Sequence, residues 1–160
     1  MITYGGLSLD VHRFAEMFML GTDSKVGIWE SCSPPIMYAR LKERVGQLTL
    51  LTPDTSIGQS KSLKLLTFDD ATKKRPRPEI DMWIVFDPDN IGMPTFLPEL
   101  TKLSLKKRGR IVLIKRKTLV PTIQMSTLNA MFVSEGLKHV GSLDLNPQLA
   151  CDVFYKEKRR

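Results

Sequence analysis

Three polar side chains in the middle of the chain could bind a ligand because of what precedes them. Asp87, Asp89 and Asn90 directly follow an apolar segment, Asp81–Phe86, and a second apolar run, Ile111–Ile114, comes after a helix-length segment. Short apolar runs on either side of a helix are typical of buried parallel strands. Open parallel sheets bind ligands at the carboxyl ends of their strands, so this position favours a functional role. The alternative is an ordinary Asp-Pro-Asp-Asn turn, stabilised by local hydrogen bonds.

The hydrophobic pattern predicts the elements that position these residues. We expect helices at Asp10–Leu20, Pro34–Arg44, Phe96–Leu105 and Ile123–Glu135. We expect strands at Val26–Glu30, Leu48–Leu51, Leu63–Phe68, Asp81–Phe86, Arg110–Ile114, His139–Leu145 and Asp152–Lys156. Gly21 and Gly136 are placed to end helices, and Trp29 and Trp83 fall inside strands as core residues. Strands that alternate with helices and close with a hairpin predict an α/β fold: a doubly wound, mostly parallel sheet with an antiparallel C-terminal hairpin.

Length and composition indicate a single globular domain. The chain has 160 residues, of which 42% are hydrophobic, and this is enough for one hydrophobic core. We expect one domain at 1–160, with an N-terminal helical segment at 1–24 and the core at 25–156. Charged residues interrupt Met1–Leu20, unlike a signal peptide, and no apolar run reaches the ~18–20 residues of a membrane span. We therefore expect an intracellular, cytoplasmic protein with no membrane partner.

Several common chemistries lack the residues that they need. The two cysteines and two histidines show no zinc spacing, so we expect no metal site. A glycine-rich phosphate loop ending in Gly-Lys-Ser/Thr is absent, which removes the usual nucleotide hydrolase. Cys32 has no histidine near it in sequence, so a small packed thiol is favoured over a nucleophile. Asp69 and Asp70 follow the third strand, whereas receiver domains carry their paired acids after the first, so that class is excluded.

Positive charge is concentrated along the sequence, and the formal net charge is +7. The clusters are Lys73, Lys74, Arg75 and Arg77; Lys102, Lys106, Lys107, Arg108, Arg110, Lys115, Arg116 and Lys117; and Lys156, Lys158, Arg159 and Arg160. Clustered cations release counterions when they meet phosphates, which predicts a nucleic acid, RNA above all, or another polyanion as partner. The predicted contact residues are Lys73, Lys74, Arg75, Lys106, Lys107 and Arg108. The alternative is that these charges only keep the protein soluble, and no aromatic residues interleave them as in single-strand binders.

The order of elements and several short motifs resemble the class I methyltransferases that use S-adenosylmethionine (SAM). The resemblance runs from about residue 25 to residue 156 and is clearest in the second half. LKKRGRIVLIKRK, residues 105–117, is similar to the family's helix end, glycine turn and fifth strand. SEGLKHVGSLDLNPQLACDVFYKEKR, residues 134–159, is similar to its final helix and closing hairpin. The resemblance implies a Rossmann-like fold and SAM as the cofactor.

The resemblance also implies which residues form the site. In the family, acidic and small residues at the ends of the first three strands hold the methionine part, the ribose and the adenine of SAM. The matching residues here are Glu30, Ser31 and Cys32; Asp54; and Asp69, Asp70 and Ala71. The fourth strand leads to the motif nearest the transferred methyl group, where Asp87, Asp89 and Asn90 would orient a substrate amine. Asp69 and Asp70 could instead cap the turn that follows them.

The chain departs from the family pattern after the first strand. No glycine follows Glu30, and Pro34 and Pro35 carry no backbone N–H to face a ligand at the helix start. Two hypotheses remain. The leading one is a SAM-dependent methyltransferase-like protein that acts on nucleic acid, RNA more than DNA. The alternative is a catalytically inactive methyltransferase-like scaffold or interaction domain in a larger nucleic-acid-associated assembly, whose loop glycines were lost because no cofactor is bound.

Overall fold

The computed structural model describes residues 2–4, 7–31, 35–53, 56–73, 75–86, 93–117 and 122–157. The strands in these ranges are β1 (Ile2–Tyr4), β2 (Leu7–Leu9), β3 (Lys25–Glu30), β4 (Gln47–Leu51), β5 (Leu63–Leu66), β6 (Ile80–Phe86), β7 (Leu105–Arg116), β8 (Lys138–Asp144) and β9 (Leu149–Tyr155). The helices are α1 (Val11–Met17), α2 (Met37–Leu41), α3 (Phe68–Lys73), α4 (Leu97–Ser104) and α5 (Thr122–Val133).

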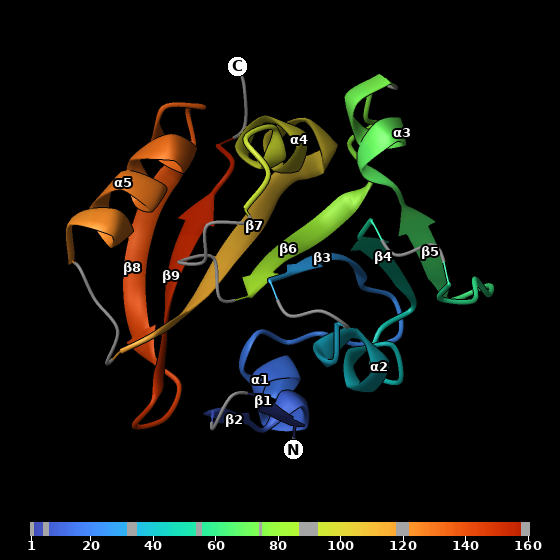
Figure 1. The fold of residues 1–160 in the computed structure, drawn as a ribbon, viewed down its shortest axis with the longest axis horizontal. Coiled ribbons are helices and arrows are strands. Elements are labelled where there is room, and N and C mark those ends of the chain that lie inside the picture. Colours follow the sequence, from blue (N-terminus) through green and yellow to red (C-terminus); the bar gives the residue numbers. More distant parts are fainter. Residues whose placement is uncertain are drawn as a thin grey trace.

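Seven of these strands form one sheet in the order β5-β4-β3-β6-β7-β9-β8 (Figure 1). The five strands from β5 to β7 are parallel, and β9 pairs antiparallel with both β7 and β8. The predicted mostly parallel sheet with an antiparallel C-terminal hairpin is confirmed. From β3 the chain builds the sheet outward to β5 and then returns to β6 on the other side of β3. The topological switch point therefore lies between β3 and β6, where open α/β sheets bind ligands.

The central strands are apolar on both sides because a layer of helices covers each face. On one face, Val26, Ile28 and Ile84 belong to a core with α1 and α2. On the other, Trp83 and Ile111 belong to a core with α4 and with Phe132 of α5. Trp29 and Trp83 are 3% and 0% exposed, so their predicted place in the core is confirmed.

The first two helices are shorter than predicted. α1 ends at Met17, before the expected stop at Gly21, because Met19 takes the left-handed backbone (φ 55°) that closes a helix end. The amides of Met19 and Leu20 donate to the carbonyls of Glu16 and Ala15, the pattern of a Schellman cap. α2 covers only Met37–Leu41 of the expected Pro34–Arg44.

Three further elements differ from the prediction. β5 ends at Leu66 rather than Phe68, because the Thr67 hydroxyl accepts the Asp70 amide (3.1 Å) and starts α3, which the pattern did not predict. β7 begins five residues before Arg110, so the expected Lys-Lys-Arg-Gly turn is strand. The β1–β2 hairpin was also not predicted. It docks on the β8–β9 turn, where Asn146 Nδ2 donates to the Ser8 carbonyl (2.8 Å).

Candidate functional site

The ends of β3 and β6 meet at the switch point and form the centre of the candidate site. Glu30 is paired with Phe86 in the sheet, and the Ser31 amide donates to the Phe86 carbonyl (3.2 Å). The first residue beyond β3 is therefore fixed against the last residue of β6. Thr52, at the end of β4, is 6% exposed and donates its amide to Leu66 of β5 (3.1 Å). The sheet thus holds the ends of four parallel strands in one line.

Glu30 is a buried carboxylate that accepts hydrogen bonds from backbone amides. Its side chain is 7% exposed; one oxygen accepts the amides of Ile36 (2.9 Å) and Met37 (2.7 Å), and the other that of Tyr38 (3.1 Å). Charge-assisted bonds of this kind compensate the cost of burying a carboxylate. Glu30 is therefore a buried carboxylate with its charge compensated, and its predicted contact with a cofactor stays a prediction. Glu30 ties the start of α2 back to the end of β3, so it fixes the segment that follows the strand.

Ser31 carries the one buried side-chain oxygen at this edge that has no hydrogen-bond partner among the described residues. Native proteins pair nearly all their buried polar atoms, and an unpaired one calls for a partner such as a ligand or an ordered water. Elsewhere in the described chain the same holds only for Asn129 Oδ1. Ser31 Oγ therefore marks the switch point as a place where a polar ligand atom would be stabilised.

Asp69, Asp70 and Ala71 form the first turns of α3, just past the end of β5. Asp69 pairs with Lys73 at 3.1 Å, and both side chains are about 70% exposed, so this pair is weak. Asp70 is half-buried and Ala71 packs against the core on the α4 side. Both predicted uses of these acids, ligand contact and helix capping, remain predictions; Thr67, not an aspartate, caps α3.

Several predicted site residues lie outside the described ranges. They are Cys32, Asp54, Lys74, Asp87, Asp89 and Asn90. Ser31, Pro53 and Phe86, which precede Cys32, Asp54 and Asp87, are described and lie at the carboxyl edge of the sheet. The assignments to this edge therefore stay as predictions.

Part of the predicted basic surface lies at the opposite edge of the sheet. Leu105 is paired with Ile80 at the start of β6, whereas Ile114 is paired with Phe86 at its end. Lys106, Lys107 and Arg108 follow Leu105, so they are separated from the end of β6 by nearly its whole length, about 20 Å. The prediction that these three contact nucleic acid stays a prediction, and such a contact would lie at the amino edge of the sheet, because the start of a parallel strand lies opposite its carboxyl end.

A buried polar network links β7, β8, β9 and α5, and the sequence did not reveal it. Asp152 is 2% exposed and pairs with Lys115; it also accepts the Ser142 hydroxyl and the Asn129 side-chain amide (3.2 Å). His139 Nε2 lies 3.1 Å from Asp152 Oδ1. Burial raises the pKa of Asp152, but the hydrogen bonds from Lys115, Ser142 and His139 lower it by more, so its pKa lies below the ordinary value.

The neighbouring thiol has no nucleophilic character. Burial, helped by the charge of Asp152, raises the pKa of Cys151 to about 11, so the thiol stays protonated at neutral pH. No group of three or more metal-ligating side chains occurs among the described residues, and no helix there is long and apolar enough to cross a membrane.

Comparison with known proteins gives similarity in structure alone. No protein-family model and no curated protein matches the sequence. A SAM-dependent methyltransferase from Aquifex aeolicus superimposes with a TM-score of 0.70 at 9% identity, over 92% of this chain and 89% of that one. A putative type 11 methyltransferase from Sulfolobus solfataricus superimposes with a TM-score of 0.67 at 13% sequence identity, over 92% of both chains. Phosphoethanolamine N-methyltransferase 2 from Haemonchus contortus, in complex with SAM, superimposes with a TM-score of 0.65 at 7% sequence identity, over 91% of this chain and 51% of that one.

The chain has the Rossmann-like fold of class I SAM-dependent methyltransferases. At 7–13% identity these matches establish the arrangement of the elements and leave the chemistry to the residues of the site. The resemblance drawn from the sequence motifs is thus confirmed as a resemblance in fold.

Proposed function

We propose that this protein binds SAM at the carboxyl edge of its sheet and transfers the methyl group to a nucleic acid, with RNA as the expected acceptor. The observation that carries the proposal is Ser31 Oγ, a buried oxygen without a partner in the described chain, at the switch point between β3 and β6. A polar group of the cofactor would supply that partner. The solved structures with this fold include methyltransferases, one of them holding SAM.

The residues at the edge fit a cofactor of this kind. Ser31 and Cys32 would contact its methionine part, Asp54 the ribose, and Asp69, Asp70 and Ala71 the adenine. Glu30 has its oxygens on the amides of α2, so its proposed role is to hold the segment after β3 in place rather than to touch the cofactor. Bound SAM supplies an electrophilic methyl group; the chain supplies position.

The proposed acceptor-binding residues are Asp87, Asp89 and Asn90, which follow Phe86. Their oxygens would accept hydrogen bonds from an amine of the substrate and turn its lone pair toward the methyl group. Orientation of this kind accounts for much of the rate gain in reactions between two bound groups. Lys73 ends α3, and Lys74 and Arg75 follow it in sequence. These three residues would hold the phosphates of the acceptor, while Lys106, Lys107 and Arg108 would bind phosphates at the amino edge of the sheet.

The test is methyl transfer from SAM with a labelled methyl group, with RNA, DNA and protein as parallel acceptors. We expect labelled RNA with the wild type and a loss of about 100-fold with Asn90→Ala, because misplacing one reactant costs about that much. Asp23→Ala is the matched control, an exposed residue just before β3 at the opposite edge, and should keep wild-type activity. Equal activity in both variants, or label in none of the acceptors, would contradict the proposal.

A second candidate, a non-catalytic scaffold, is favoured by the contacts of Glu30. Its carboxylate takes three amides at the start of α2, and Pro35 has none to offer, so fewer backbone donors remain for a ligand there. Under this alternative the fold serves a nucleic-acid-associated assembly without cofactor chemistry. It predicts neither methyl transfer nor a thermal shift with SAM, and the two measurements together separate it from the first proposal.

A further inference from the structure

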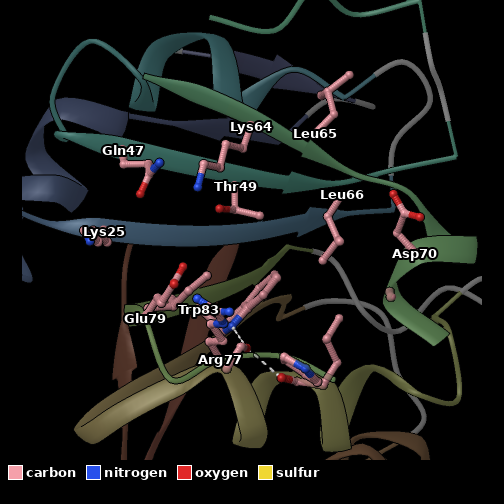
Figure 2. A pocket seen from close by; sticks show the side chains of 15 residues that line it. Lys25, Gln47, Thr49, Lys64, Leu65, Leu66, Asp70, Arg77, Glu79 and Trp83 are labelled. Carbon is pink, nitrogen blue, oxygen red and sulfur yellow. Dashed lines mark hydrogen bonds between the residues drawn. The ribbon is translucent and has the colours of Figure 1, made fainter. Parts of the chain in front are cut away.

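A hollow of about 200 Å³ lies on the face of β3, β4 and β5 that points toward α3 and α4 (Figure 2). It exists because α3 is only six residues long. Pro76 and Pro78 follow α3 and cannot continue a helix, so no helix covers the middle of these three strands. The hollow lies over the face of the sheet and meets the carboxyl-edge site at its α3 end, where Asp70 and Ala71 line it.

The floor of the hollow is polar. Gly27, Thr49 and Lys64 are paired in register across β3, β4 and β5, so all three residues lie on the same face of the sheet. The Trp83 ring lies against Gly27, where a Cβ atom would be 2.6 Å from the ring. Trp83 therefore forms a wall, while Thr49 and Lys64 stay accessible beside Gln47 (Figure 2). A face meant for permanent burial would carry apolar residues here, as the rest of the sheet does.

Three cations line this hollow without a neutralising partner in the described chain. Lys25, Lys64 and Arg77 are exposed and form no ion pair with a described residue. Other cations are paired: Lys106 with Asp81 at 3.1 Å, for example. Two acids, Asp70 and Glu79, also line the hollow; Asp70 lies at the α3 end, whereas Glu79 lies at the same end as Lys25 (Figure 2). The three cations outnumber these two acids, so the lining carries a net positive charge that favours an anion.

The size of the hollow indicates that it receives one group of a larger ligand. At about 200 Å³ it is smaller than the ~300–1,000 Å³ typical of pockets for whole small molecules. A second hollow of about 540 Å³ adjoins it and shares Ala71, Pro76 and Leu100. Lys73, Arg75 and Phe96 line this second hollow. Phe96 is half-buried, and its ring packs edge-on against Phe68 with the ring centroids 5.5 Å apart. Cations beside a partly exposed aromatic ring are a combination found in proteins that bind single-stranded nucleic acid.

Further basic residues lie near Lys25 at the start of β7. One oxygen of Asp81 accepts the Lys25 amide (2.8 Å) and the other pairs with Lys106. Lys107 and Arg108, both exposed, follow Lys106.

We propose that the two hollows bind single-stranded nucleic acid, with one base in the smaller hollow beside Thr49 and with phosphates on Lys25, Lys64 and Arg77. Phe96 provides a ring for the next base. The strand would lie across the α3–α4 face, so this is a holding site and not the site of chemistry. The inference rests on the proposed function for the class of partner, and Asp70 and Ala71, which the proposed function assigns to the adenine, lie at the α3 end of the smaller hollow.

The test is the binding of a fluorescent single-stranded RNA oligonucleotide, measured by anisotropy over a series of salt concentrations. Lys64→Ala with Arg77→Ala should lower the slope of log affinity against log salt by about 1.4, at roughly 0.7 per phosphate contact. Thr49→Phe fills the smaller hollow without a change of charge. It should weaken binding about tenfold, within the range of one lost base contact. Circular dichroism and melting temperature confirm that each variant is folded.

The control is Lys42→Ala, which removes an exposed cation from the end of α2 on the other face of the sheet. It should leave the slope unchanged. Wild-type binding in the folded Thr49→Phe and Lys64→Ala/Arg77→Ala variants would overturn the inference. So would equal affinity for duplex RNA, or for a mononucleotide alone. SAM titration of the same variants separates the two proposals. If the protein binds RNA as expected but does not bind SAM, the proposed function alone is contradicted. If the protein binds SAM but the variants bind RNA as the wild type does, only this inference is contradicted.

Discussion

The role of Glu30 depends on its hydrogen-bond partners as well as on its residue type. Glu30 was expected to be functional because a buried, unpaired carboxylate is costly. The structure places it at a strand end, as expected, but gives it three amides from Ile36, Met37 and Tyr38. That pairing depends on how the chain turns back after β3, and the sequence alone carries no signal for it. The one signal available was the predicted helix shortly after the strand, whose free amides need acceptors.

Met19 gives a test of the structure at one residue. It closes α1 with φ 55°, a backbone that costs a side-chain-bearing residue about 1–2 kcal/mol, and it is 83% exposed. Met19→Gly removes that strain and loses about 0.5–1 kcal/mol through the flexibility of glycine. We expect a net gain of roughly 0.5–1 kcal/mol, or about 1–4 °C in melting temperature.

The control for Met19 is Met17→Gly, at the last helical residue of α1 and 45% exposed. It should destabilise by about 0.5–1 kcal/mol, because glycine in a helical backbone costs conformational entropy. If thermal unfolding shows that Met19→Gly is also destabilising, the Schellman cap described for α1 is wrong.

At the scale of elements, the sequence predicted the strands whose own residues determine them, and it did not predict contacts between separate elements. The apolar runs around Ile28, Ile84 and Val112 give the central strands, because continuous apolar residues require burial on both faces. The network on Asp152 joins residues from four elements, and nothing in their spacing connects them. The short α3 is intermediate: Pro76 and Pro78 showed where a helix could not run, but not that one began at Phe68.

The Asp152 network should stabilise the packing of the C-terminal hairpin on β7. Asp152→Asn would leave the largely buried ammonium of Lys115 unpaired, so we expect a loss of about 3 kcal/mol in the free energy of unfolding at pH 7. The pKa of Asp152 is lowered in the fold, so its contribution is complete above about pH 4, the unfolded pKa, and is lost as pH falls further. The gap between variant and wild type should therefore narrow in acid.

Denaturant unfolding between pH 7 and acid measures both effects. Asp144→Asn is the control, because Asp144 pairs with Lys117 at 3.2 Å but is 79% exposed, and such pairs contribute less than about 1 kcal/mol. An Asp152→Asn variant as stable as Asp144→Asn, or a gap that persists unchanged in acid, would show that the network does not stabilise the fold in this way.

For the whole molecule, the sequence was enough for the fold class, while the ligand site at the carboxyl edge of the sheet stays a prediction. Alternating elements and the closing hairpin predicted the sheet that the structure has. The sequence was not enough to place the basic residues, because Lys106–Arg108 were assigned to a turn and belong to β7. It also could not show that Lys25, Lys64 and Arg77 line one hollow.

The central claim, a SAM site at the switch point, is tested most directly by calorimetric titration of SAM into the wild type and Ser31→Ala. Removing a buried hydroxyl that has no partner in the part of the chain the structure describes should leave the SAM-free protein as stable as before or more so, because an unpaired polar group costs free energy. The same change should weaken SAM about tenfold, since a hydrogen bond to the cofactor is lost and 1.4 kcal/mol corresponds to that factor. No heat with the wild type at millimolar SAM, or identical affinity in Ser31→Ala, would contradict the claim.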